Sequence, residues 1–352
     1  MRNNITRSQM QFQDNYSLQQ LNTFGINAYA KYYVEIHTLS DLIELIDTDI
    51  YRQSEHLILG GGSNILLLTD FDGLVIKNCL EGIDVVKKDT QHVWVKTGAG
   101  VVWHDFVLDC IKNDLGGVEN LSLIPGTVGA APMQNIGAYG VEIKDTFESL
   151  EAFNKATGQL ETFDNTSCKF GYRDSIFKRK ARDQYFITSV TFKLTRENHD
   201  LNISYGAIQE ILLEDKITSP TIRDVSNAVI KIRQSKLPDP NKIGNAGSFF
   251  KNPTIDKIDH EALQNEFPTM PGYQLPNQQV KVPAGWLIEQ CGWKGKTINN
   301  IGVHKHQALV LVNYGKGKGS DIKDLSIEIQ KSVIAKFGIS LTPEVNFVPS
   351  LS

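Results

Sequence analysis

The sequence predicts an α+β protein with more than one domain, and three observations lead to this prediction. The chain has 352 residues, a length at which two or three hydrophobic cores usually form. Apolar runs of strand length dominate residues 22–213, and segments with helical periodicity lie between them. The hydrophobic fraction of 41% and the charged fraction of 22% are those of an ordinary globular protein.

The first part of the chain alternates strands with one helix and carries a glycine-rich loop between two of the strands. A Ser40 cap and the periodicity that follows predict a helix over 40–46. The apolar runs around it predict strands over 32–36, 57–59, 65–68 and 74–77.

Strand patterns continue through the middle of the chain, and helices dominate its last third. The pair Thr157-Gly158 between two alternating runs predicts a hairpin turn. Strands are predicted over 83–86, 92–97, 150–154, 185–194 and 308–313. Helices are predicted over 101–113, 223–235, 284–290 and 320–337, the last ending before Gly338.

Charge and cysteine usage exclude several classes of protein. The net charge of −4 disfavours nucleic acid or a membrane surface as the main partner. No apolar run approaches the roughly 18–20 residues that span a bilayer. The four cysteines are widely spaced, which predicts free thiols in a reducing compartment and favours no metal site. The polar first 16 residues predict a disordered leader on a cytoplasmic protein.

The segment 57–64, LILGGGSN, is the most informative stretch of the chain. Glycines let a backbone approach a ligand closely, so the N–H groups of such a loop can converge on a phosphate. Neither a Gly-Lys-Ser/Thr sequence nor a helix follows, which excludes a Walker loop and the usual dinucleotide fingerprint. The alternative interpretation is a tight hairpin turn.

A second segment rich in small residues, 123–140, has the sequence LIPGTVGAAPMQNIGAYG and no charged side chain. Such a backbone can wrap a flat ring system, although a buried crossover of small residues is also possible. Tyr139 is its polar side chain, and an isolated tyrosine of this kind is more often part of a core than a ligand.

Arg173 lies within the aromatic and apolar sequence FGYRDSIF at 170–177. An arginine is rarely buried without a fixed anionic partner. That partner is either the neighbouring Asp174, in a structural pair, or the carboxylate of a substrate.

Three further segments carry polar residues of possible function. Ser248 follows small residues in GNAGSFFKNP at 244–253, but its surroundings lack the nucleophile elbow of a hydrolase. Arg233 and Lys236 close a helix, where they either interact with its negative end or bind phosphate. Glu344 lies in an extended segment near the C-terminus, where a glutamate is usually solvated.

Taken in this order, the motifs resemble the UDP-N-acetylenolpyruvoylglucosamine reductase family over residues 18–349. The resemblance rests on NTFG at 22–25, the GGGSN loop, the 123–140 segment, FGYRDSIF, KLPDP, GNAGSFFKNP, AGWLIEQCG and the terminal Pro-Glu-Val. Ser204-Tyr205-Gly206 is similar to the branch of the family with an additional tyrosine-bearing loop over the substrate.

The resemblance implies a vanillyl-alcohol-oxidase-type FAD-binding fold of two α+β domains plus a third α+β domain for the substrate. We expect the first FAD-binding part over 17–78 and the second over 79–215, with 340–352 returning to the second. The substrate-binding domain is expected over 216–339, and the leader over 1–16.

The resemblance also implies the reaction. NADPH reduces non-covalently bound FAD, which then reduces the enolpyruvyl ether of UDP-N-acetylglucosamine enolpyruvate to UDP-N-acetylmuramate, a peptidoglycan precursor. Arg173 and Glu344 match the positions that stabilise the enolate-like intermediate, and Ser248 matches the proton donor. Glu344 must be protonated or hydrogen-bonded to help, so we expect its pKa to be raised.

The remaining matches concern binding. The segments 57–68 and 123–140 contain no histidine or cysteine that could form a covalent link to the flavin. Separately, the protein is expected to be a monomer. The positions implied to contact FAD are Gly60, Gly61, Gly62, Ser63, Asn64, Ile65, Gly126, Thr127, Gly129, Ala130, Asn135 and Gly137. The positions implied to hold the UDP-sugar are Tyr139, Tyr205, Arg233, Lys236, Asn252 and Gln307.

Two alternatives remain open from the sequence. A different flavin oxidoreductase of the same fold would act on another substrate. A non-catalytic nucleotide-binding or sugar-binding protein is the second, and the joint presence of Arg173, Ser248 and Glu344 argues against it, because a binder needs no proton donor.

Overall fold

The computed structural model describes residues 10–350, which form two compact units. Within the described residues, the first unit contains 10–16, 30–61 and 72–233, and the second contains 17–29, 62–71 and 234–350. The chain therefore crosses between the units several times, and segments far apart in sequence build each one. All four cysteines are free.

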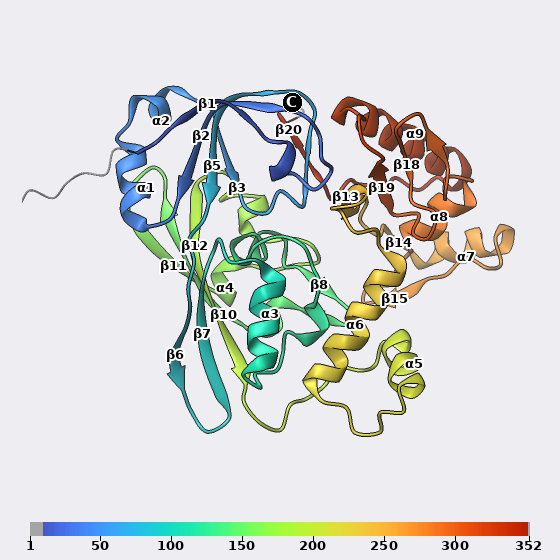
Figure 1. Ribbon diagram of the computed structural model, residues 1–352. Coiled ribbons are helices and arrows are strands. Elements are labelled where there is room, and N and C mark those ends of the chain that lie inside the picture. The colour runs from blue at the N-terminus through green and yellow to red at the C-terminus, as the bar shows by residue number, and fades with distance from the viewer. Residues whose placement is uncertain (1–9, 351–352) are drawn as a thin grey trace, which may run out of the picture. The chain divides into compact units, whose positions relative to one another are not determined.

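The first unit holds a four-stranded sheet with two short helices beside it (Figure 1). Buried Val34, Leu42, Leu45, Leu74 and Ile76 form the centre of its core. The strands lie in the order β1 (Gln13–Ser17), β2 (Tyr29–Ile36), β5 (Phe71–Asn78) and β3 (His56–Leu59), and the helices are α1 (Leu39–Ile46) and α2 (Asp49–Gln53).

The cap of α1 differs from the sequence prediction. The hydroxyl of Thr38 accepts a hydrogen bond from the Asp41 N–H at 3.1 Å, and the Asp41 carboxylate accepts one from the Thr38 N–H at 2.9 Å. This reciprocal pair is a capping box, so the predicted Ser40 cap is wrong by two residues.

The expected leader over 1–16 is too long. Residues 1–9 lie outside the described residues, whereas Gln13–Ser17 forms strand β1. The Tyr16 ring stacks on Tyr33, with centroids 3.9 Å apart, and Met10 and Phe12 pack against the core. The glutamine and asparagine content of the segment concealed these three apolar contacts.

A five-stranded antiparallel sheet forms the rest of the first unit's framework, and α3 (Trp103–Lys112) packs against it. Trp103, Phe106 and Phe192 pack ring against ring with centroids 4.8–5.7 Å apart. Gly158, with φ +70°, makes the predicted turn between two of the strands. The strand order is β11 (Leu160–Asp164), β10 (Phe147–Asn154), β12 (Tyr185–Thr195), β7 (His92–Gly98) and β6 (Ile83–Lys88).

Smaller elements complete the first unit. Ile208 and Leu212 of α5 (Gly206–Glu214) pack on Val229 and Ile232 of α6 (Ile222–Lys236); α5 was not predicted from the sequence. The remaining elements are the pair β8 (Gly137–Ala138) and β9 (Val141–Glu142), helix α4 (Asn165–Cys168), and 3₁₀ turns at Glu119–Leu121, Val128–Ala130, Pro132–Gln134, Ile143–Asp145 and Ile176–Lys178.

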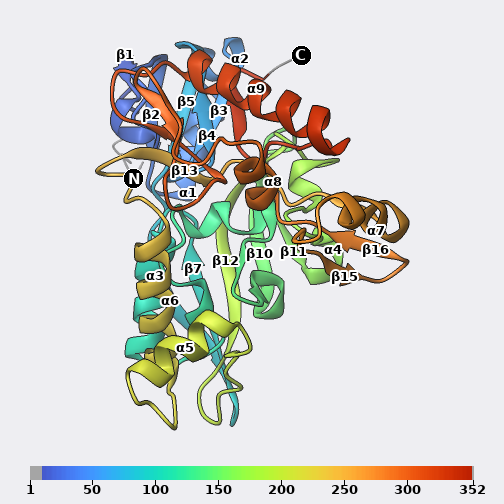
Figure 2. The same ribbon diagram turned by 90° about the vertical axis from the view of Figure 1, so that its right-hand side faces the viewer.

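The second unit contains a four-stranded sheet, and α9 (Gly319–Phe337) packs against two of its strands (Figure 2). Gly338 caps α9 with φ +69°, as predicted. The strand order is β13 (Gly244–Ser248), β19 (Val310–Asn313), β18 (Ile301–Val303) and β17 (Thr297–Ile298). Helices α8 (Ala284–Gln290) and α7 (Lys257–Glu266), the sheet β14 (Thr254–Asp256), β16 (Gln279–Lys281) and β15 (Tyr273–Leu275), and a 3₁₀ turn at Gln19–Leu21 complete it.

The C-terminal strand pairs differently from the prediction. Strand β20 (Asn346–Val348) runs parallel to β4 (Ile65–Leu67), directly after the glycine-rich loop. The segment expected to return to 79–215 therefore pairs with residues from the first part of the chain instead. Across residues 10–350, no helix is both long enough and apolar enough to cross a membrane.

Candidate active site

The two glycine-rich loops lie against each other within the first unit. A Cβ added to Gly60 would lie 2.5 Å from the Thr127 Oγ1, and one added to Gly61 would lie 2.9 Å from the Gly126 Cα. Neither position has room for a side chain: Gly60 lies against the Thr127 side chain, and Gly61 lies against the Gly126 backbone. The chain then enters β4 and not a helix, as the sequence predicted.

A cavity of about 160 Å³ opens beside this contact. Gly60, Thr127, Gly129 and Ala130, four of the positions expected to contact FAD, line it. The structure therefore brings residues from both predicted loops to one cavity. Its small volume suits one portion of a dinucleotide rather than the whole molecule.

Lys77 is a residue of this region that the sequence did not single out. It is the last residue but one of β5, and its Nζ donates a hydrogen bond to the Gly60 carbonyl. Burial lowers the pKa of its ammonium. The bond fixes the first peptide of the loop, and only the pairing of β3 with β5 brings the two residues together.

Asn135 fixes the second loop to the turn that carries Arg173. Asn135 is buried in the left-handed region with φ +43°, and its Nδ2 donates to Glu142 at 2.9 Å and to the Gly171 carbonyl at 3.0 Å. Its Oδ1 accepts the Lys144 N–H at 3.2 Å. Both ends of the amide are thus used in holding the fold, and the expected FAD contact stays a prediction.

Arg173 occupies a strained position in a four-residue turn. The backbones of Gly171 and Asp174 exchange hydrogen bonds of 3.0 and 3.2 Å, and Arg173 between them has φ +53°. That conformation favours glycine or asparagine. The guanidinium donates to the Gly137 carbonyl at 2.5 Å, while Asp174 forms an ion pair with Arg179 at 3.1 Å.

Arg233, Tyr139 and Tyr205 form a second group in the first unit. The rings of Tyr139 and Tyr205 meet edge to face with centroids 5.0 Å apart. Burial lowers the pKa of Arg233, a hydrogen bond with Tyr139 opposes that shift, and the charge of Arg173 adds to it. Burial also raises the pKa of Tyr139. Two arginine charges and a phenol therefore act on one region, which suits an anionic ligand.

His104 and Asn120 support this group and were not predicted from the sequence. Nδ1 of His104 accepts the Leu123 N–H at 2.9 Å, and the Leu123 carbonyl accepts Nε of Arg233 at 3.2 Å. Nδ2 of the buried Asn120 donates to the carbonyls of Tyr139 at 3.1 Å and Asn202 at 2.8 Å. These contacts connect segments that are distant in the sequence, so no local sequence pattern predicts them.

In the second unit, backbone pairing brings Ser248 and Glu344 close together. The Glu344 N–H donates to the carbonyl of Phe249, the residue after Ser248, at 2.8 Å. The Lys251 N–H donates to the Thr342 carbonyl at 2.9 Å, which continues the pairing. The side chain of Ser248, at the end of β13, is exposed.

The glycine-rich loop holds Glu344 from its other side. Nδ2 of Asn64 donates to the Glu344 carbonyl at 3.3 Å. The Asn346 N–H and side-chain amide both donate to the Asn64 carbonyl at 3.0 Å. Gly62 lies against Leu21, whose carbonyl oxygen would be 1.9 Å from an added Cβ, so Ser63 and Ile65 follow a tightly packed turn.

Asn252 and Gln307 lie at the beginning of α8 in the second unit. The Asn252 Oδ1 accepts the Ala284 N–H at 2.9 Å. The Gln307 Oε1 accepts the Leu309 N–H at 3.3 Å and would lie 3.2 Å from a Cβ on Gly285. Lys236 is exposed at the end of α6, three residues after Arg233.

Comparison with known proteins identifies the chain. Residues 30–164 match the FAD-binding domain family, which together with the paired glycine-rich loops defines a flavin-dependent oxidoreductase. Residues 239–348 match the family described as UDP-N-acetylenolpyruvoylglucosamine reductase, C-terminal domain. The chain belongs to the UDP-N-acetylenolpyruvoylglucosamine reductase family.

The relatives cover the chain almost completely. The enzyme of that name from Flavobacterium johnsoniae is 53% identical over 96% of this chain and 100% of its own. The Amoebophilus asiaticus enzyme is 50% identical over the same shares. The crystal structure of the Thermus caldophilus reductase has a TM-score of 0.65, with 22% identity, over 96% of this chain and 98% of its own. The predicted family and FAD-binding fold are confirmed.

The contact between Gly61 and Gly126 gives a first prediction. In Gly61→Ala the new methyl group would meet backbone, so the loops must move apart and FAD should dissociate at least about tenfold more readily. Gly206→Ala is the matched control, because its Cβ meets nothing within 4 Å. Flavin fluorescence on dilution measures the loss; wild-type affinity in Gly61→Ala would contradict the close approach.

His104 gives a prediction of pH dependence. Burial lowers the pKa of His104 below its ordinary value of about 6.5. The unfolded state then binds the proton more readily, so stability present above about pH 6.5 is lost as pH falls toward the lower folded pKa.

His104→Asn keeps an acceptor for the Leu123 N–H and does not titrate. Urea unfolding on both sides of about pH 6.5 should show the wild type losing stability relative to this variant as pH falls. Parallel curves for the two proteins would show that His104 is not held neutral.

Proposed function

We propose that this chain reduces UDP-N-acetylglucosamine enolpyruvate to UDP-N-acetylmuramate, with FAD as resident cofactor and NADPH as reductant. The observation that carries the proposal is the match to reductases of this name over 96% of the chain, at up to 53% identity in the relatives described. Arg173, Ser248 and Glu344 are all present, so the chain retains the groups that the reaction requires.

Backbone groups of the two glycine-rich loops are proposed to hold FAD. Gly60, Gly61 and Gly126 present main chain with no side chain between, which suits hydrogen bonds to a diphosphate. FAD bound there would supply the hydride transfer, from NADPH to the terminal carbon of the enolpyruvyl group. The remaining steps belong to the protein's side chains.

Arg173 is proposed to bind the carboxylate of the enolpyruvyl group. Its charge stabilises the negative charge that spreads over that carboxylate and the adjacent carbon as the hydride arrives. The turn with φ +53° holds the residue in a conformation that costs free energy, and the Gly137 carbonyl fixes the guanidinium. Strain of this kind is characteristic of functional sites.

Glu344 and Ser248 are proposed to act on the same intermediate. A protonated Glu344 donates a hydrogen bond to the enolate-like oxygen, and Ser248 donates a proton to the carbon next to the carboxylate. The hydrogen bond between the Glu344 N–H and the Phe249 carbonyl keeps the two segments in register. Asn64 holds the opposite side of the Glu344 peptide.

The UDP portion is proposed to bind to Tyr139, Tyr205, Arg233 and Lys236. Arg233 and Lys236, one helical turn apart on α6, provide charge for the diphosphate. The exposed Tyr205 ring, packed edge to face on Tyr139, offers an apolar surface with a hydroxyl. Asn252 and Gln307 are also proposed to contact the UDP-sugar, through their side-chain amides.

We also propose that the enzyme acts as a monomer in the cytoplasm. Its four cysteines are free, which suits a reducing compartment. Light scattering of the purified holoenzyme tests the oligomeric state.

The function is tested with two half-reactions. The purified protein should show a flavin spectrum that NADPH bleaches, and the enolpyruvyl substrate should restore it. A colourless protein, or NADPH oxidation indifferent to this substrate, would overturn the proposal. Restoration by a different acceptor alone would indicate another flavin oxidoreductase.

Ser248→Ala separates the roles of the residues. Bleaching by NADPH should stay within about twofold of the wild type, while restoration by substrate slows at least about 100-fold, a typical loss for a proton donor. Ser248→Cys, which keeps a proton on the side chain, should recover part of that loss. Equal slowing of both half-reactions in stopped flow would assign Ser248 to folding or flavin binding.

Arg173→Asn tests whether Arg173 serves chemistry or the fold. Asparagine tolerates positive φ, so the free energy of unfolding should change by no more than about 1 kcal/mol. Reoxidation by the enolpyruvyl substrate should slow at least about 100-fold because the carboxylate loses its cation. A variant that unfolds easily yet retains reoxidation would show that Arg173 is structural.

A further inference from the structure

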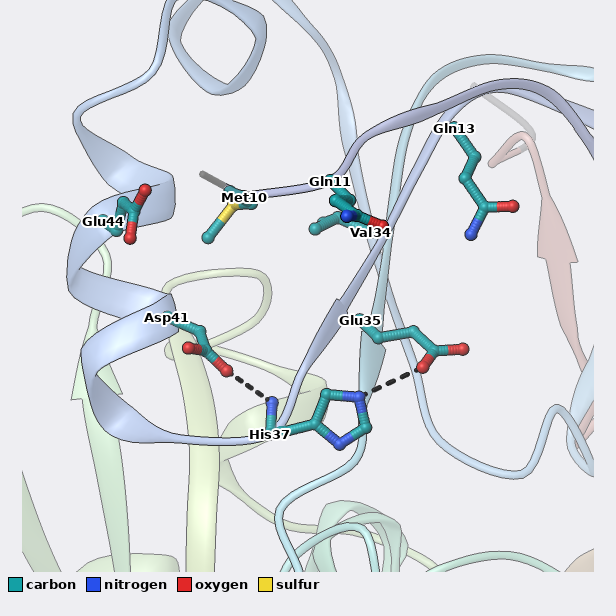
Figure 3. A pocket seen from close by; sticks show the side chains of 8 residues that line it. All are labelled: Met10, Gln11, Gln13, Val34, Glu35, His37, Asp41 and Glu44. Atoms are coloured by element: carbon teal, nitrogen blue, oxygen red, sulfur yellow. Dashed lines mark hydrogen bonds and ion pairs between the residues drawn. The ribbon is translucent and has the colours of Figure 1, made fainter. Parts of the chain in front are cut away.

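Outside the candidate active site, three metal-ligating side chains meet at the edge of the first sheet. They are Glu35 at the end of β2, His37 just after it, and Cys79 just after β5. One ligand atom from each lies within 4.8 Å of the others. Figure 3 shows the Glu35 carboxylate directed at the His37 ring, with Oε2 and Nε2 3.1 Å apart.

The strand geometry explains why these residues meet. Residues two apart along a strand share one face, so Glu35 and His37 point the same way. The Cys79 N–H donates to the Ile36 carbonyl at 2.9 Å, which places Cys79 beside the residue between them. Cys79 is more than forty positions from Glu35 and His37 in the sequence, and this is why the cysteine spacing predicted no metal site.

Two of the three residues, Glu35 and His37, also make hydrogen bonds to residues outside the cluster. The buried Tyr33 hydroxyl donates to the Glu35 Oε1 at 2.7 Å, which leaves Oε2 to face His37. Tyr33 is itself fixed by stacking on Tyr16. The His37 N–H donates to the Asp41 carboxylate at 2.9 Å, as Figure 3 shows. Such outer contacts orient ligands in metal sites.

We propose that Glu35, His37 and Cys79 bind a zinc ion, with water in the fourth position. A thiolate, an imidazole and a carboxylate form a donor set that zinc accepts, and three protein ligands with one open position is a common zinc arrangement. Nothing in the proposed reduction uses these residues, so the site is separate from the active site.

The distances fit a small adjustment. Zinc bonds of about 2.0–2.3 Å in a tetrahedron place neighbouring ligand atoms about 3.3–3.8 Å apart. The Glu35–His37 contact of 3.1 Å is already close to this range, and Cys79 must move by about an ångström. Rotation about side-chain bonds supplies such a movement without change in the strands.

The charge also balances. Binding displaces the Cys79 thiol proton to solvent, and the thiolate with the Glu35 carboxylate then neutralises the two positive charges of the metal. Lys77 is the cation that faces Glu35 and Cys79, and the Gly60 carbonyl accepts a hydrogen bond from its ammonium. The complex of zinc, thiolate and carboxylate is therefore neutral, and the Lys77 ammonium is the cation that remains beside it.

A cavity of about 530 Å³ gives the metal a path to the cluster. Glu35 and His37 belong to its wall, and the carboxylates of Asp41 and Glu44 make the wall acidic, which attracts cations (Figure 3). The other lining residues are Met10, Gln11, Gln13 and Val34.

The test is a zinc titration of the purified holoenzyme in competition with a chromophoric chelator. We expect one zinc per chain, with affinity at least about tenfold lower in Cys79→Ser and in His37→Gln. Cys291→Ser and His92→Gln are the matched controls. Cys291 is the other half-buried free cysteine, and His92 is another histidine paired with a carboxylate, Asp89, at 3.6 Å. Both controls should retain wild-type affinity.

A second measurement identifies the ligands. Cobalt in place of zinc should give the intense bands of a tetrahedral site to the red of the flavin absorption, and Cys79→Ser should abolish them. An unchanged flavin spectrum shows that each variant is folded. Equal zinc affinity in variants and controls, or the weak spectrum of octahedral cobalt, would overturn the proposal and leave Glu35 and His37 as an ion pair.

Discussion

The close approach of two backbones, at Gly61 and Gly126, is the constraint on which the first unit's site depends. The Gly61 position leaves no room for a Cβ, since one would lie 2.9 Å from Gly126. The segment that begins at Gly126 then continues through Asn135 to Gly137, and these residues hold the turn of Arg173. The placement of the guanidinium therefore follows from a chain of contacts that starts where two loops touch.

The second unit reaches a similar result with long-range backbone pairing. Residues 249–251 and 342–344 exchange hydrogen bonds, although about ninety residues separate them in the sequence. Asn64 and the parallel pair of β4 and β20 add a third segment to the arrangement. Ser248, at the end of β13, and Glu344, in an extended segment, are thus held in register by backbone hydrogen bonds, which suits the proton transfer proposed for them.

The sequence predicted what local patterns encode. Periodicity located the helices at 284–290 and 320–337, and the glycine runs located the two loops that lie against each other. It failed where distant segments decide the outcome: strand β1 stacks Tyr16 on Tyr33, and β20 pairs with β4. The supporting contacts of His104 and Lys77 are of the same kind, because each joins a side chain to a carbonyl or amide in another element.

Two arginines of the first unit, Arg173 and Arg233, are held in states that cost free energy. Arg233 is half-buried, and both its partial burial and the charge of Arg173 lower its pKa, so its charged form is held at a cost in free energy. Arg173 also occupies a backbone conformation that costs free energy. Neither feature stabilises the folded chain, whereas an anionic group beside the two cations would stabilise their charged forms. These costs are what the proposed role of this region in binding an anion would explain, and the Tyr139 hydrogen bond opposes the effect of burial on Arg233.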